Sequence, residues 1–486
     1  MTARALSILG TSSHVGKTWI TAGLCRLLAD EGIQVAPFKA QNMSLNAYVT
    51  DDGLEMSYAQ AIQAWSARIA PNVLMNPILL KPETTQRSQL IVRGRVQGPY
   101  DSGHFREHRD ALFAVVQDAY DQLARHYDVI LIEGAGSPVE LNLMQTDLSN
   151  LRLAEYADSR VILVGDIDRG GLFASLYGTV KLLPSKAQTR LSGLLVNKFR
   201  GDMTLFNEGV RILEDLTTVP VLGVIPYVPL AFPQEDSLGV PTNTSQTGHI
   251  TIGVVRLPYM SNFTDFDPFR FEPDVNLVFL ASPPGKRPDM IIIPGSKNTL
   301  ADLAWIQKTK WDECLMRWAR EGTMIAGICG GFQMMGELVA DPLGIEGPPH
   351  DDRGLGFFPI QTILGRYKTT RQVVGKGMEG PWKDQMISGY EQHMGETVIL
   401  DMDDSPYRPL LAIEDHTDGL MTSSAQIWGT YLHGVFHNAQ FRHTIINQLG
   451  GQGVLTDSPF DVVINQWKEV IAQHVDLSAL LRLVGG

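Results

Sequence analysis

The chain has 486 residues, of which 44% are hydrophobic and 19% charged, with a formal net charge of −13. That length predicts several domains rather than one core, and the acidic balance argues against a nucleic-acid-binding protein. Its 3 cysteines show no metal-type spacing and strand-like residues begin close to Met1, which argues against a disulfide scaffold and a signal peptide and indicates a cytoplasmic protein.

Apolar runs of strand length recur through the first half of the chain, with helical patterns between several of them. They occupy residues 5–9, 33–38, 129–132, 161–164, 194–196 and 221–225. This alternation is typical of an α/β fold, and it predicts a doubly wound parallel sheet with helices on both faces.

A glycine-rich loop, GTSSHVGKT from Gly10 to Thr18, follows the first strand and precedes a helical pattern. In a strand–loop–helix arrangement, backbone N–H groups and the helix dipole hold phosphate oxygens. We expect Gly10 and Gly16 to shape this loop, Lys17 to neutralise the outer phosphates of ATP, and the Thr18 hydroxyl to bind Mg²⁺. Five residues separate Gly10 from Gly16, where the common P-loop has four.

Two later strands of this series end in carboxylates. Glu133 closes YDVILIE, where it is well placed to bind Mg²⁺ directly or through water, although a helix-capping or salt-bridged glutamate is the alternative. Asp166 and Asp168 follow the strand at 161–164, near the same predicted sheet edge.

The loop GTSSHVGKT resembles that of dethiobiotin synthetase and its relatives, which include the MinD/ParA-type ATPases. The resemblance implies that ATP activates a carboxylate. It also implies that Asn197, in LLVNK, reads adenine; an ordinary strand-end turn residue is the alternative.

Two segments rich in amides and basic residues are candidates for binding an anionic substrate. FKAQNMSLNA, at 38–47, follows the second strand, and a basic stretch covers residues 75–95. We single out Lys39, Gln41, Asn42 and Lys81 as substrate residues, with a solvated loop surface as the alternative.

Residues 216–234 form an uncharged run long enough to raise the question of a membrane span. Prolines at 220, 226, 229 and 233 would break such a helix, so we interpret the run as strand and loop and expect no membrane association. The segment 233–249 is rich in turn-forming and small polar residues and is the predicted linker.

A second α/β series follows, with strand-like segments at 252–256, 277–280, 290–293, 323–328, 397–400 and 427–431. The tail, 460–483, has the apolar spacing of one or two amphipathic helices, and we expect it to pack back on the body of the protein rather than to bind a partner.

Cys329 stands between glycines in GICGGFQMMG, directly after the strand predicted at 323–328. Such glycines permit the sharp strand-to-helix turn that exposes a nucleophile, and the apolar spacing of Phe332, Met335 and Val339 predicts that the helix continues through them. A helix N-terminus at the turn favours the thiolate, whereas a buried structural cysteine is the alternative.

His433, in IWGTYLHGVF, closes the strand predicted at 427–431 and could meet Cys329 at one sheet edge. Together they would form a nucleophile–base pair, in which His433 raises the thiolate fraction and protonates the leaving ammonia. A histidine with a purely structural hydrogen bond is the alternative.

The second half resembles a triad-type glutamine amidotransferase domain. The resemblance rests on GICGGFQMMG, IIIPGSKNT, SGYEQHMG and GTYLHGVF. With the dethiobiotin-synthetase-like half before it, the whole chain is similar to the cobyric acid synthase family, and FKAQNMSLNA, MNPILLKP and LIEGAGSPVELNL favour that family over the a,c-diamide synthases.

The resemblance implies four segments. Residues 1–232 would form an ATP- and corrinoid-binding domain with a P-loop NTPase-like sheet. The linker covers 233–249, a class I glutamine amidotransferase-like domain covers 250–445, and a helical tail covers 446–486.

It implies, too, that Cys329 forms a glutamyl thioester, with backbone N–H groups at Gly295 and Gly330 holding the oxyanion. The expected partners are L-glutamine, Mg²⁺-ATP and adenosylcobyrinic acid a,c-diamide, with no tightly bound prosthetic group. The b, d, e and g carboxylates would be amidated. Nothing in the sequence sets the oligomeric state.

One position departs from the amidotransferase pattern. Ordinary triad enzymes carry glutamate two residues after the histidine, where this chain has Val435. Either another group orients His433, with Glu391 and His393 nearby in the motif set, or Cys329 and His433 act as a dyad. The rival functions are a cobyrinic acid a,c-diamide synthase of the same architecture and a MinD/ParA-like switch, which would not need the cysteine–histidine pair.

Overall fold

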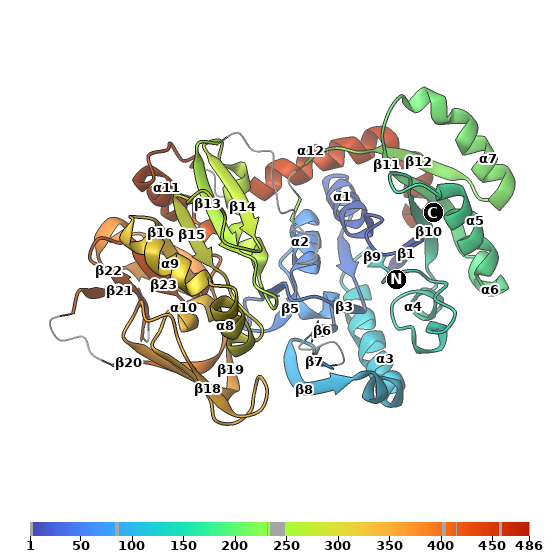
Figure 1. The fold of residues 1–486 in the computed structure, drawn as a ribbon. Coiled ribbons are helices and arrows are strands. Elements are labelled where there is room, and N and C mark those ends of the chain that lie inside the picture. The colour runs from blue at the N-terminus through green and yellow to red at the C-terminus, as the bar shows by residue number, and fades with distance from the viewer. Residues whose placement is uncertain are drawn as a thin grey trace. The chain divides into compact units, whose positions relative to one another are not determined.

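The computed structural model describes residues 3–82, 87–230, 232–233, 248–400, 405–414, 416–455 and 459–485. The chain divides into two compact units (Figure 1). Unit 1 comprises Met1–Ser44, Glu55–Phe232 and Phe460–Gly486, and unit 2 comprises Leu45–Leu54 and Pro233–Pro459.

The main sheet of unit 1 has the strand order β12-β11-β10-β1-β9-β2, and each neighbouring pair is parallel. The strands are β1 (Arg4–Gly10), β2 (Val35–Phe38), β9 (Val129–Glu133), β10 (Arg160–Asp166), β11 (Leu191–Phe199) and β12 (Val221–Pro226). Every strand predicted in the first half is therefore confirmed. Their central residues are buried because helices cover the apolar sheet.

The helices of unit 1 are α1 (Lys17–Asp30), α2 (Tyr58–Ser66), α3 (Ser102–Ala124), α4 (Leu151–Tyr156), α5 (Leu172–Leu182), α6 (Ser185–Gln188), α7 (Asn207–Thr217), α12 (Pro459–His474) and α13 (Leu477–Gly485). A second sheet, ordered β3-β6-β7-β8, was not predicted. Its strands are β3 (Gln41–Met43), β6 (Ile78–Pro82), β7 (Arg87–Val92) and β8 (Arg95–Asp101). Apart from three apolar residues each in β6 and β7, these strands are polar, so they lack the longer apolar runs that mark the main sheet.

Unit 2 is built on a sheet whose parallel part has the order β14-β13-β15-β16-β23. These strands are β13 (Ile250–Val255), β14 (Val275–Leu280), β15 (Met290–Ile293), β16 (Met324–Ile328) and β23 (Ile427–Thr430). They match the second predicted series, and a parallel α/β sheet in both units confirms the predicted fold class. The helical elements of unit 2 include η5 (Phe263–Phe271), α8 (Thr299–Lys308), α9 (Trp311–Arg320), α10 (Gly330–Met334) and α11 (Ala439–Gln448).

Further strands extend this sheet beyond β23. They are β17 (Leu338–Asp341), β18 (His350–Arg353), β19 (Ile360–Gly377), β20 (Met386–Ile399), β21 (Tyr407–Ile413), β22 (His416–Thr422) and β24 (Leu432–His433). They pair antiparallel except for β17 and β19, which are parallel to each other. The sequence indicated only the end of β20, at 397–400. The long β19–β20 ribbon alternates buried with partly exposed residues, so it has no continuous apolar run to reveal it.

The compact units depart from the predicted boundaries in two places. Residues 45–54 belong to unit 2 although they lie within the first predicted domain, and α12 and α13 belong to unit 1 rather than to a separate tail. Most of the predicted linker, residues 234–247, lies outside the described residues.

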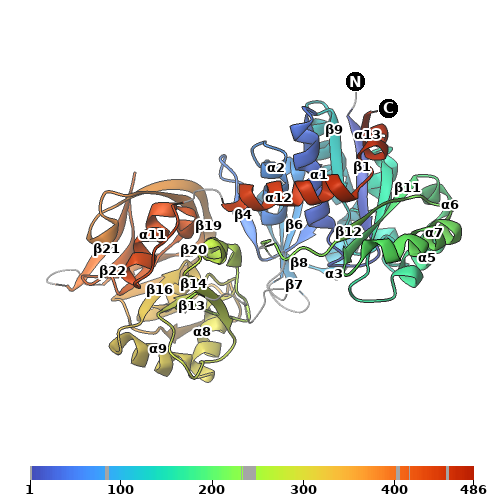
Figure 2. The same cartoon turned by 90° about the horizontal axis from the view of Figure 1, so that it is seen from above.

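The tail packs on unit 1, as we expected. In Figure 2, α12 crosses α1, and the Trp467 indole Nε1 donates a hydrogen bond to the Trp19 carbonyl oxygen at 2.6 Å. The buried Arg26 guanidinium on α1 pairs with Asp461 of α12 at 2.7 Å. A buried arginine needs a charged partner, and α12 supplies one to α1 while it also covers the apolar face of that helix. Residues from the two ends of the sequence therefore form one core.

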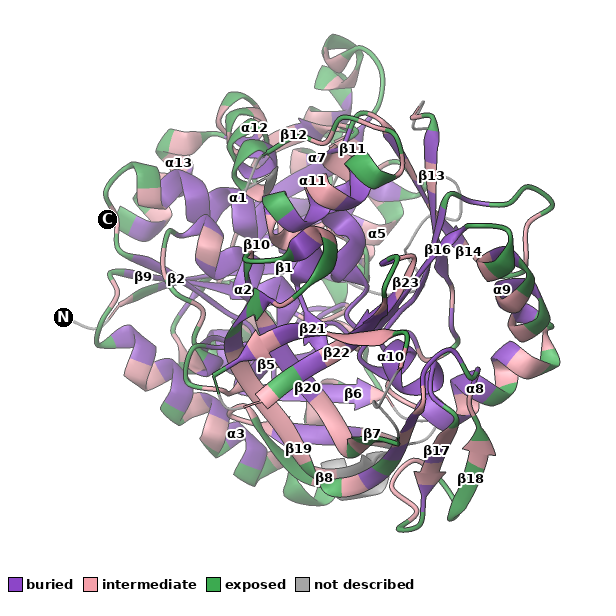
Figure 3. Cartoon of the chain, turned by 90° about the vertical axis from the view of Figure 1, so that its left-hand side faces the viewer, coloured by how far each residue is buried: buried purple, intermediate pink, exposed green. Residues whose placement is uncertain are grey.

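Figure 3 shows buried residues concentrated along the strands and on the helix faces turned toward them. In unit 2 a large apolar cluster surrounds β16, and Cys329 belongs to it. The carboxyl end of β16 thus places Cys329 in the apolar core of unit 2.

Candidate active sites

The phosphate loop lies between β1 and α1, at the carboxyl edge of the unit 1 sheet. Gly16 precedes α1 with φ +99°, a backbone angle that glycine adopts without strain. The Lys17 ammonium is buried and donates to the carbonyl oxygens of Ser12 at 2.9 Å and Gly136 at 3.0 Å. The structure therefore gathers the loop around Lys17. Nucleotide binding by Gly10, Gly16 and Lys17 stays a prediction.

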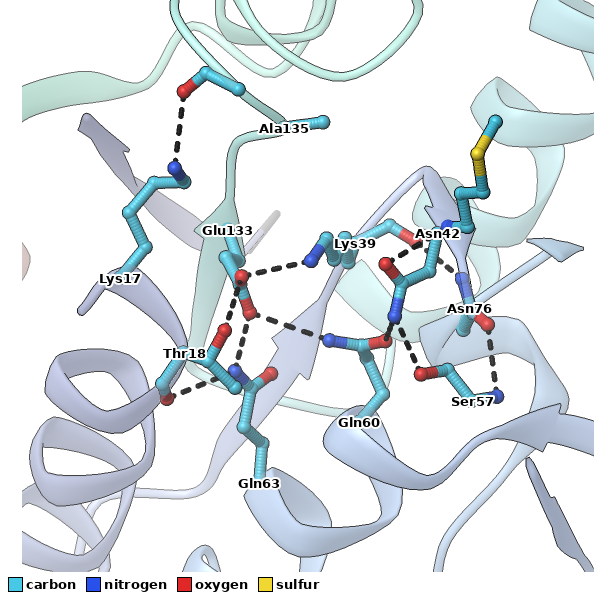
Figure 4. Close-up of polar contacts among 12 residues, drawn as sticks. Lys17, Thr18, Lys39, Asn42, Ser57, Gln60, Gln63, Asn76, Glu133 and Ala135 are labelled. Atoms are coloured by element: carbon cyan, nitrogen blue, oxygen red, sulfur yellow. Dashed lines mark hydrogen bonds and ion pairs between the residues drawn. The ribbon is translucent and has the colours of Figure 1, made fainter. Parts of the chain in front are cut away.

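Glu133 is the centre of a buried polar network at this edge (Figure 4). The Thr18 hydroxyl donates to its Oε1 at 2.7 Å, and the Lys39 ammonium lies 2.9 Å from the same oxygen. The side-chain amides of Gln63 and Gln60 donate to Oε2 at 2.6 Å and 3.3 Å. Side chains from α1, from α2 and from the residue that follows β2 thus converge on one carboxylate that is almost wholly removed from solvent.

The oxygen atoms of Thr18 and Glu133 are suitable donors for Mg²⁺, which prefers hydroxyl, carboxylate, phosphate and water oxygens. Among the residues that the structure describes, no group of three or more His, Cys, Asp or Glu side chains could hold a metal ion. Thr18 and Glu133 would therefore hold Mg²⁺ together with phosphate and water oxygens, as is common for this ion.

Asn197, predicted to read adenine, lies at the carboxyl end of β11 against the phosphate loop. Its side-chain amide donates to the Val15 carbonyl oxygen at 2.8 Å. A Cβ atom at position 16 would lie only 2.2 Å from Asn197 Nδ2, so Gly16 is required by this packing as well as by its φ angle. In this arrangement Asn197 supports the loop, and its contact with adenine stays a prediction.

The predicted substrate residues lie on the small sheet and beside the Glu133 network. Lys81, on β6, forms a buried ion pair with Glu55. The Asn42 side-chain amide donates to the Ser57 hydroxyl at 2.6 Å, and Gln41 precedes it on β3. A second buried lysine–carboxylate pair therefore accompanies that of Lys39 and Glu133, and substrate binding by these residues stays a prediction.

Sequence reasoning missed Gln60 and Gln63. They lie three positions apart on α2, a spacing that puts both amides on one helix face, and both are fully buried. Paired amides at helical spacing in an otherwise apolar helix were the available signal.

Cys329 occupies the turn between β16 and α10 with φ +52° and ψ −110°. Non-glycine residues rarely adopt positive φ, and such strain is typical of a nucleophile at a strand-to-helix turn. A Cβ atom at position 331 would lie 2.0 Å from the Ile293 carbonyl oxygen, so glycine is required there. The backbone on both sides of the thiol is thus held in one unusual conformation.

The helix after Cys329 is shorter than we predicted. α10 ends at Met334, and residues from Leu338 onward form β17. The Glu337 N–H donates to the Ile360 carbonyl oxygen at 2.8 Å instead of continuing the helix, because Gly336 allows the two backbones to approach. The prediction failed because Leu338 and Val339 share the helical spacing while they belong to a strand.

The structure brings Cys329 close to His433, as predicted, so that each lies within electrostatic reach of the other. The Cys329 thiol donates to the Gln392 carbonyl oxygen at 3.4 Å. His433 Nδ1 lies 2.7 Å from Asp265 Oδ2, and the Gly434 N–H donates to Asp265 Oδ1 at 3.1 Å. All three side chains are buried. Cys329, His433 and Asp265 therefore form a triad whose carboxylate comes from η5, far upstream of the histidine.

Neither of the residues we considered as partners of His433 takes that role. Glu391 pairs with Arg371 at 2.5 Å and with His416 at 2.9 Å. The His393 ring stacks on Tyr431 with centroids 3.9 Å apart. Asp265 was missed because nothing links it to His433 in the sequence. The only signal was an acidic residue within the aromatic stretch FTDFDPF.

The charges at the triad favour a protonated histidine. Burial opposes the imidazolium, yet the Asp265 carboxylate and Cys329 raise the pKa of His433 well above its usual range. At His393 burial dominates instead and lowers the pKa to about 4. Of these two histidines, His433 is thus the one that can give up a proton at neutral pH.

The two glycines predicted at the oxyanion site lie beside the triad. A Cβ atom at position 295 would lie 3.1 Å from His433 Cε1, and one at position 330 would lie 2.9 Å from the Ser296 backbone nitrogen. The Ser296 hydroxyl donates to Asp302 at 2.5 Å, which holds the loop after β15 in place. The backbone of both loops can thus approach a bound amide closely, while oxyanion binding stays a prediction.

Comparison with known protein families matches both halves of the chain. Residues 6–236 match the family described as CobQ/CobB/MinD/ParA nucleotide binding domain, and residues 251–441 match the CobB/CobQ-like glutamine amidotransferase domain. The expected P-loop and amidotransferase domains are confirmed.

Proteins named cobyric acid synthase are similar over almost the whole chain. The protein from Chloroflexus aggregans is 44% identical, with 99% of each chain covered. That from Herpetosiphon aurantiacus is 42% identical, with 98% of this chain and 96% of the relative covered. That from Limosilactobacillus reuteri is 40% identical over 98% of this chain and 97% of the relative. Among the described residues, no helix has the length and apolar character needed to span a membrane.

Proposed function

The chain belongs to the cobyric acid synthase family and is a glutamine-dependent ligase, and we propose that it amidates the b, d, e and g carboxylates of adenosylcobyrinic acid a,c-diamide in cobalamin biosynthesis. Ammonia would come from L-glutamine at the triad of unit 2, and ATP would activate each carboxylate in unit 1. The observation that carries the proposal is the Cys329–His433–Asp265 triad in a chain that also has the phosphate loop and the Glu133 network.

In unit 2, Cys329 Sγ would attack the side-chain carbonyl carbon of glutamine. The C–N bond then breaks, His433 gives its proton to the departing nitrogen, and ammonia and a glutamyl thioester result. Water hydrolyses the thioester to glutamate. Asp265 orients the imidazole and stabilises its charged form, and N–H groups near Gly295 and Gly330 would stabilise the oxyanion.

In unit 1, a substrate carboxylate oxygen would attack the γ-phosphorus of ATP, which gives an acyl phosphate and ADP. Ammonia then replaces phosphate at the acyl carbon and leaves an amide. Lys17 would hold the outer phosphates, and Thr18 with Glu133 would hold Mg²⁺, which neutralises charge on the transferred group. Lys39, which lies against Glu133 at 2.9 Å, would meet the anion as it forms.

The test is an assay with two corrinoid acids, adenosylcobyrinic acid a,c-diamide and cobyrinic acid. Purified full-length protein with ATP, Mg²⁺ and glutamine should convert adenosylcobyrinic acid a,c-diamide to the product with four further amides, detected by mass, and should release phosphate only when glutamine or ammonium is present. Amidation of cobyrinic acid at positions a and c instead would identify the a,c-diamide synthase activity. ATP hydrolysis without amide formation on either acid would refute both.

A further inference from the structure

Residues Leu45–Leu54, which we call the strap, leave unit 1 and return to it, yet they belong to unit 2. Asn46, Ala47, Val49 and Thr50 are each at most 2% exposed. The strap is therefore packed into unit 2 like core, although its neighbours in sequence are Ser44 and Glu55 of unit 1.

Buried hydrogen bonds attach the strap to unit 2. The Tyr390 hydroxyl donates to the Ala47 carbonyl oxygen at 3.2 Å, and the Ala47 N–H donates to Asn262 Oδ1 at 3.4 Å. The Thr264 hydroxyl donates to Asn46 Oδ1 at 2.9 Å. Two of these partners precede Asp265 by only a few residues, so the strap is bound where η5 begins.

The same partners reach the triad. The Tyr390 ring stacks on the imidazole of His433, with centroids 5.2 Å apart and planes 17° apart. Asn262 donates through Nδ2 to the Tyr390 hydroxyl at 3.1 Å, and its carbonyl oxygen accepts from the Asp265 N–H at 3.0 Å. Tyr390 therefore contacts both the strap and the catalytic histidine.

Within unit 1, adjacent residues of β6 hold both ends of the strap. The Ser44 N–H donates to the Leu80 carbonyl oxygen at 3.1 Å, and Glu55 is ion-paired with Lys81. Lys81 is one of the residues expected to meet the anionic substrate. A polycarboxylate that pairs with Lys81 would compete with Glu55, the residue that directly follows the strap.

We propose that the strap couples glutamine hydrolysis to substrate binding, with Tyr390 as the positioning residue for His433. The inference rests on the proposed function. A carboxylate of the substrate would draw Lys81 away from Glu55, the strap would shift with Glu55, and the Tyr390 hydroxyl would carry the shift to the ring that packs on His433. Ammonia would then be released faster when the acid to be amidated is bound.

The experiment measures glutamate formation by the full chain with and without Mg²⁺-ATP plus the corrinoid acid, and takes the ratio of the two rates. Tyr390→Phe removes the hydroxyl that contacts the strap but keeps the ring on His433. Asn46→Ala acts on the strap itself. Both should lower the activation ratio by at least ~5-fold, the lower end of typical coupling between sites. Tyr390→Phe should also move the pH profile of glutamine hydrolysis.

Tyr407→Phe, which alters a tyrosine packed on Phe358 away from the strap, is the matched control and should keep the wild-type ratio. An unchanged ratio in both test variants would overturn the inference, as would a wild-type enzyme whose glutamine hydrolysis ignores substrate. Equal losses in the Tyr407→Phe control would also overturn it. Ammonium-driven amidation by the wild type tests the proposed function separately, since it needs no glutamine hydrolysis.

Discussion

At the scale of single residues, the three side chains of the triad come from three different parts of the chain. Cys329 is placed by its own turn, whereas His433 is oriented by Asp265, which comes from another element. Val435 stands where a glutamate was expected, so the carboxylate has been supplied from a different part of the sheet edge. The carboxylate beside His433 is thus that of Asp265, 168 residues upstream of it.

Replacing Asp265 with asparagine should slow glutamine hydrolysis by about 10²–10⁴-fold in kcat, as expected when a histidine loses its orienting carboxylate. The carboxylate raises the pKa of His433, so its removal lowers that pKa. The imidazolium that protonates the departing nitrogen is then lost at lower pH, and the alkaline limb of the rate profile should move toward acid. A pH series of glutamate release checks this.

Asp267→Asn is the control for that variant. Asp267 lies on the same element but pairs with Arg270 at 2.8 Å. Its pH profile should match that of the wild type. A shift of equal size in both variants would show that Asp265 acts through η5 as a whole rather than on His433.

At the scale of elements, the phosphate loop depends on two constraints at Gly16. Its φ is +99°, and Asn197 on β11 fills the space where a side chain would begin. Gly32 also has positive φ, of +82°, but open space around it. Comparing alanine substitutions at the two glycines therefore distinguishes the cost of backbone strain from the cost of a packing clash.

Gly16→Ala should lower the free energy of unfolding by more than Gly32→Ala does. The control carries only the left-handed strain, about 1–2 kcal/mol. Urea titration measures both values. Calorimetry should show ATP binding weakened by at least ~10-fold, about 1.4 kcal/mol, in Gly16→Ala alone. Similar values for the two variants would mean that Asn197 moves freely and does not constrain the loop.

The first turn of α8 carries a pH-sensitive carboxyl group, that of Asp302. Burial raises the pKa of Asp302 to about 7, although hydrogen bonds from Ser296 and the Tyr259 N–H oppose the shift. The folded protein therefore holds this proton more tightly than the unfolded chain, and the stability contribution falls as pH rises from about 4 through 7.

Asp302→Asn removes this titration. The free energy of unfolding of the variant relative to the wild type should therefore increase by about 2 kcal/mol between pH 5.5 and 8. Urea unfolding followed by tryptophan fluorescence provides the comparison. Asp351→Asn, on the exposed strand β18, should show no such change. A pH-independent difference for Asp302→Asn would contradict the buried, protonated carboxyl.

At the scale of the whole molecule, the chain holds two sets of reactive groups in separate compact units. The triad lies in unit 2, and the phosphate loop with Glu133 lies in unit 1. Ammonia would be the only intermediate that one chemistry passes to the other. Each half can therefore be tested without the other.

Cys329→Ser should reduce glutamine-driven amidation by at least ~10³-fold, since the serine hydroxyl lacks a comparable anionic form. Synthesis driven by added ammonium should remain close to wild type. Mass detection of the amidated corrinoid measures both. Loss of the ammonium-driven reaction as well would contradict the two-site mechanism, provided that the variant unfolds at the wild-type temperature.

The sequence by itself determined the elements and the reactive groups that depend on local pattern. Buried strands are recognisable as apolar runs. The phosphate loop and the cysteine turn are each encoded in a few consecutive residues around Gly16 and Cys329. The α/β class, the pairing of Cys329 with His433 and the packing of the tail on the body could all be predicted for this reason.

Only the tertiary structure decided which distant side chains complete each site. Asp265 precedes His433 by 168 residues, and the strap is contributed to unit 2 by the sequence of unit 1. Such contacts depend on how β13, β16 and β23 are ordered in the sheet. A local sequence pattern does not specify the order of the strands, because residues such as Asp265 and His433 become neighbours only when the chain closes long loops.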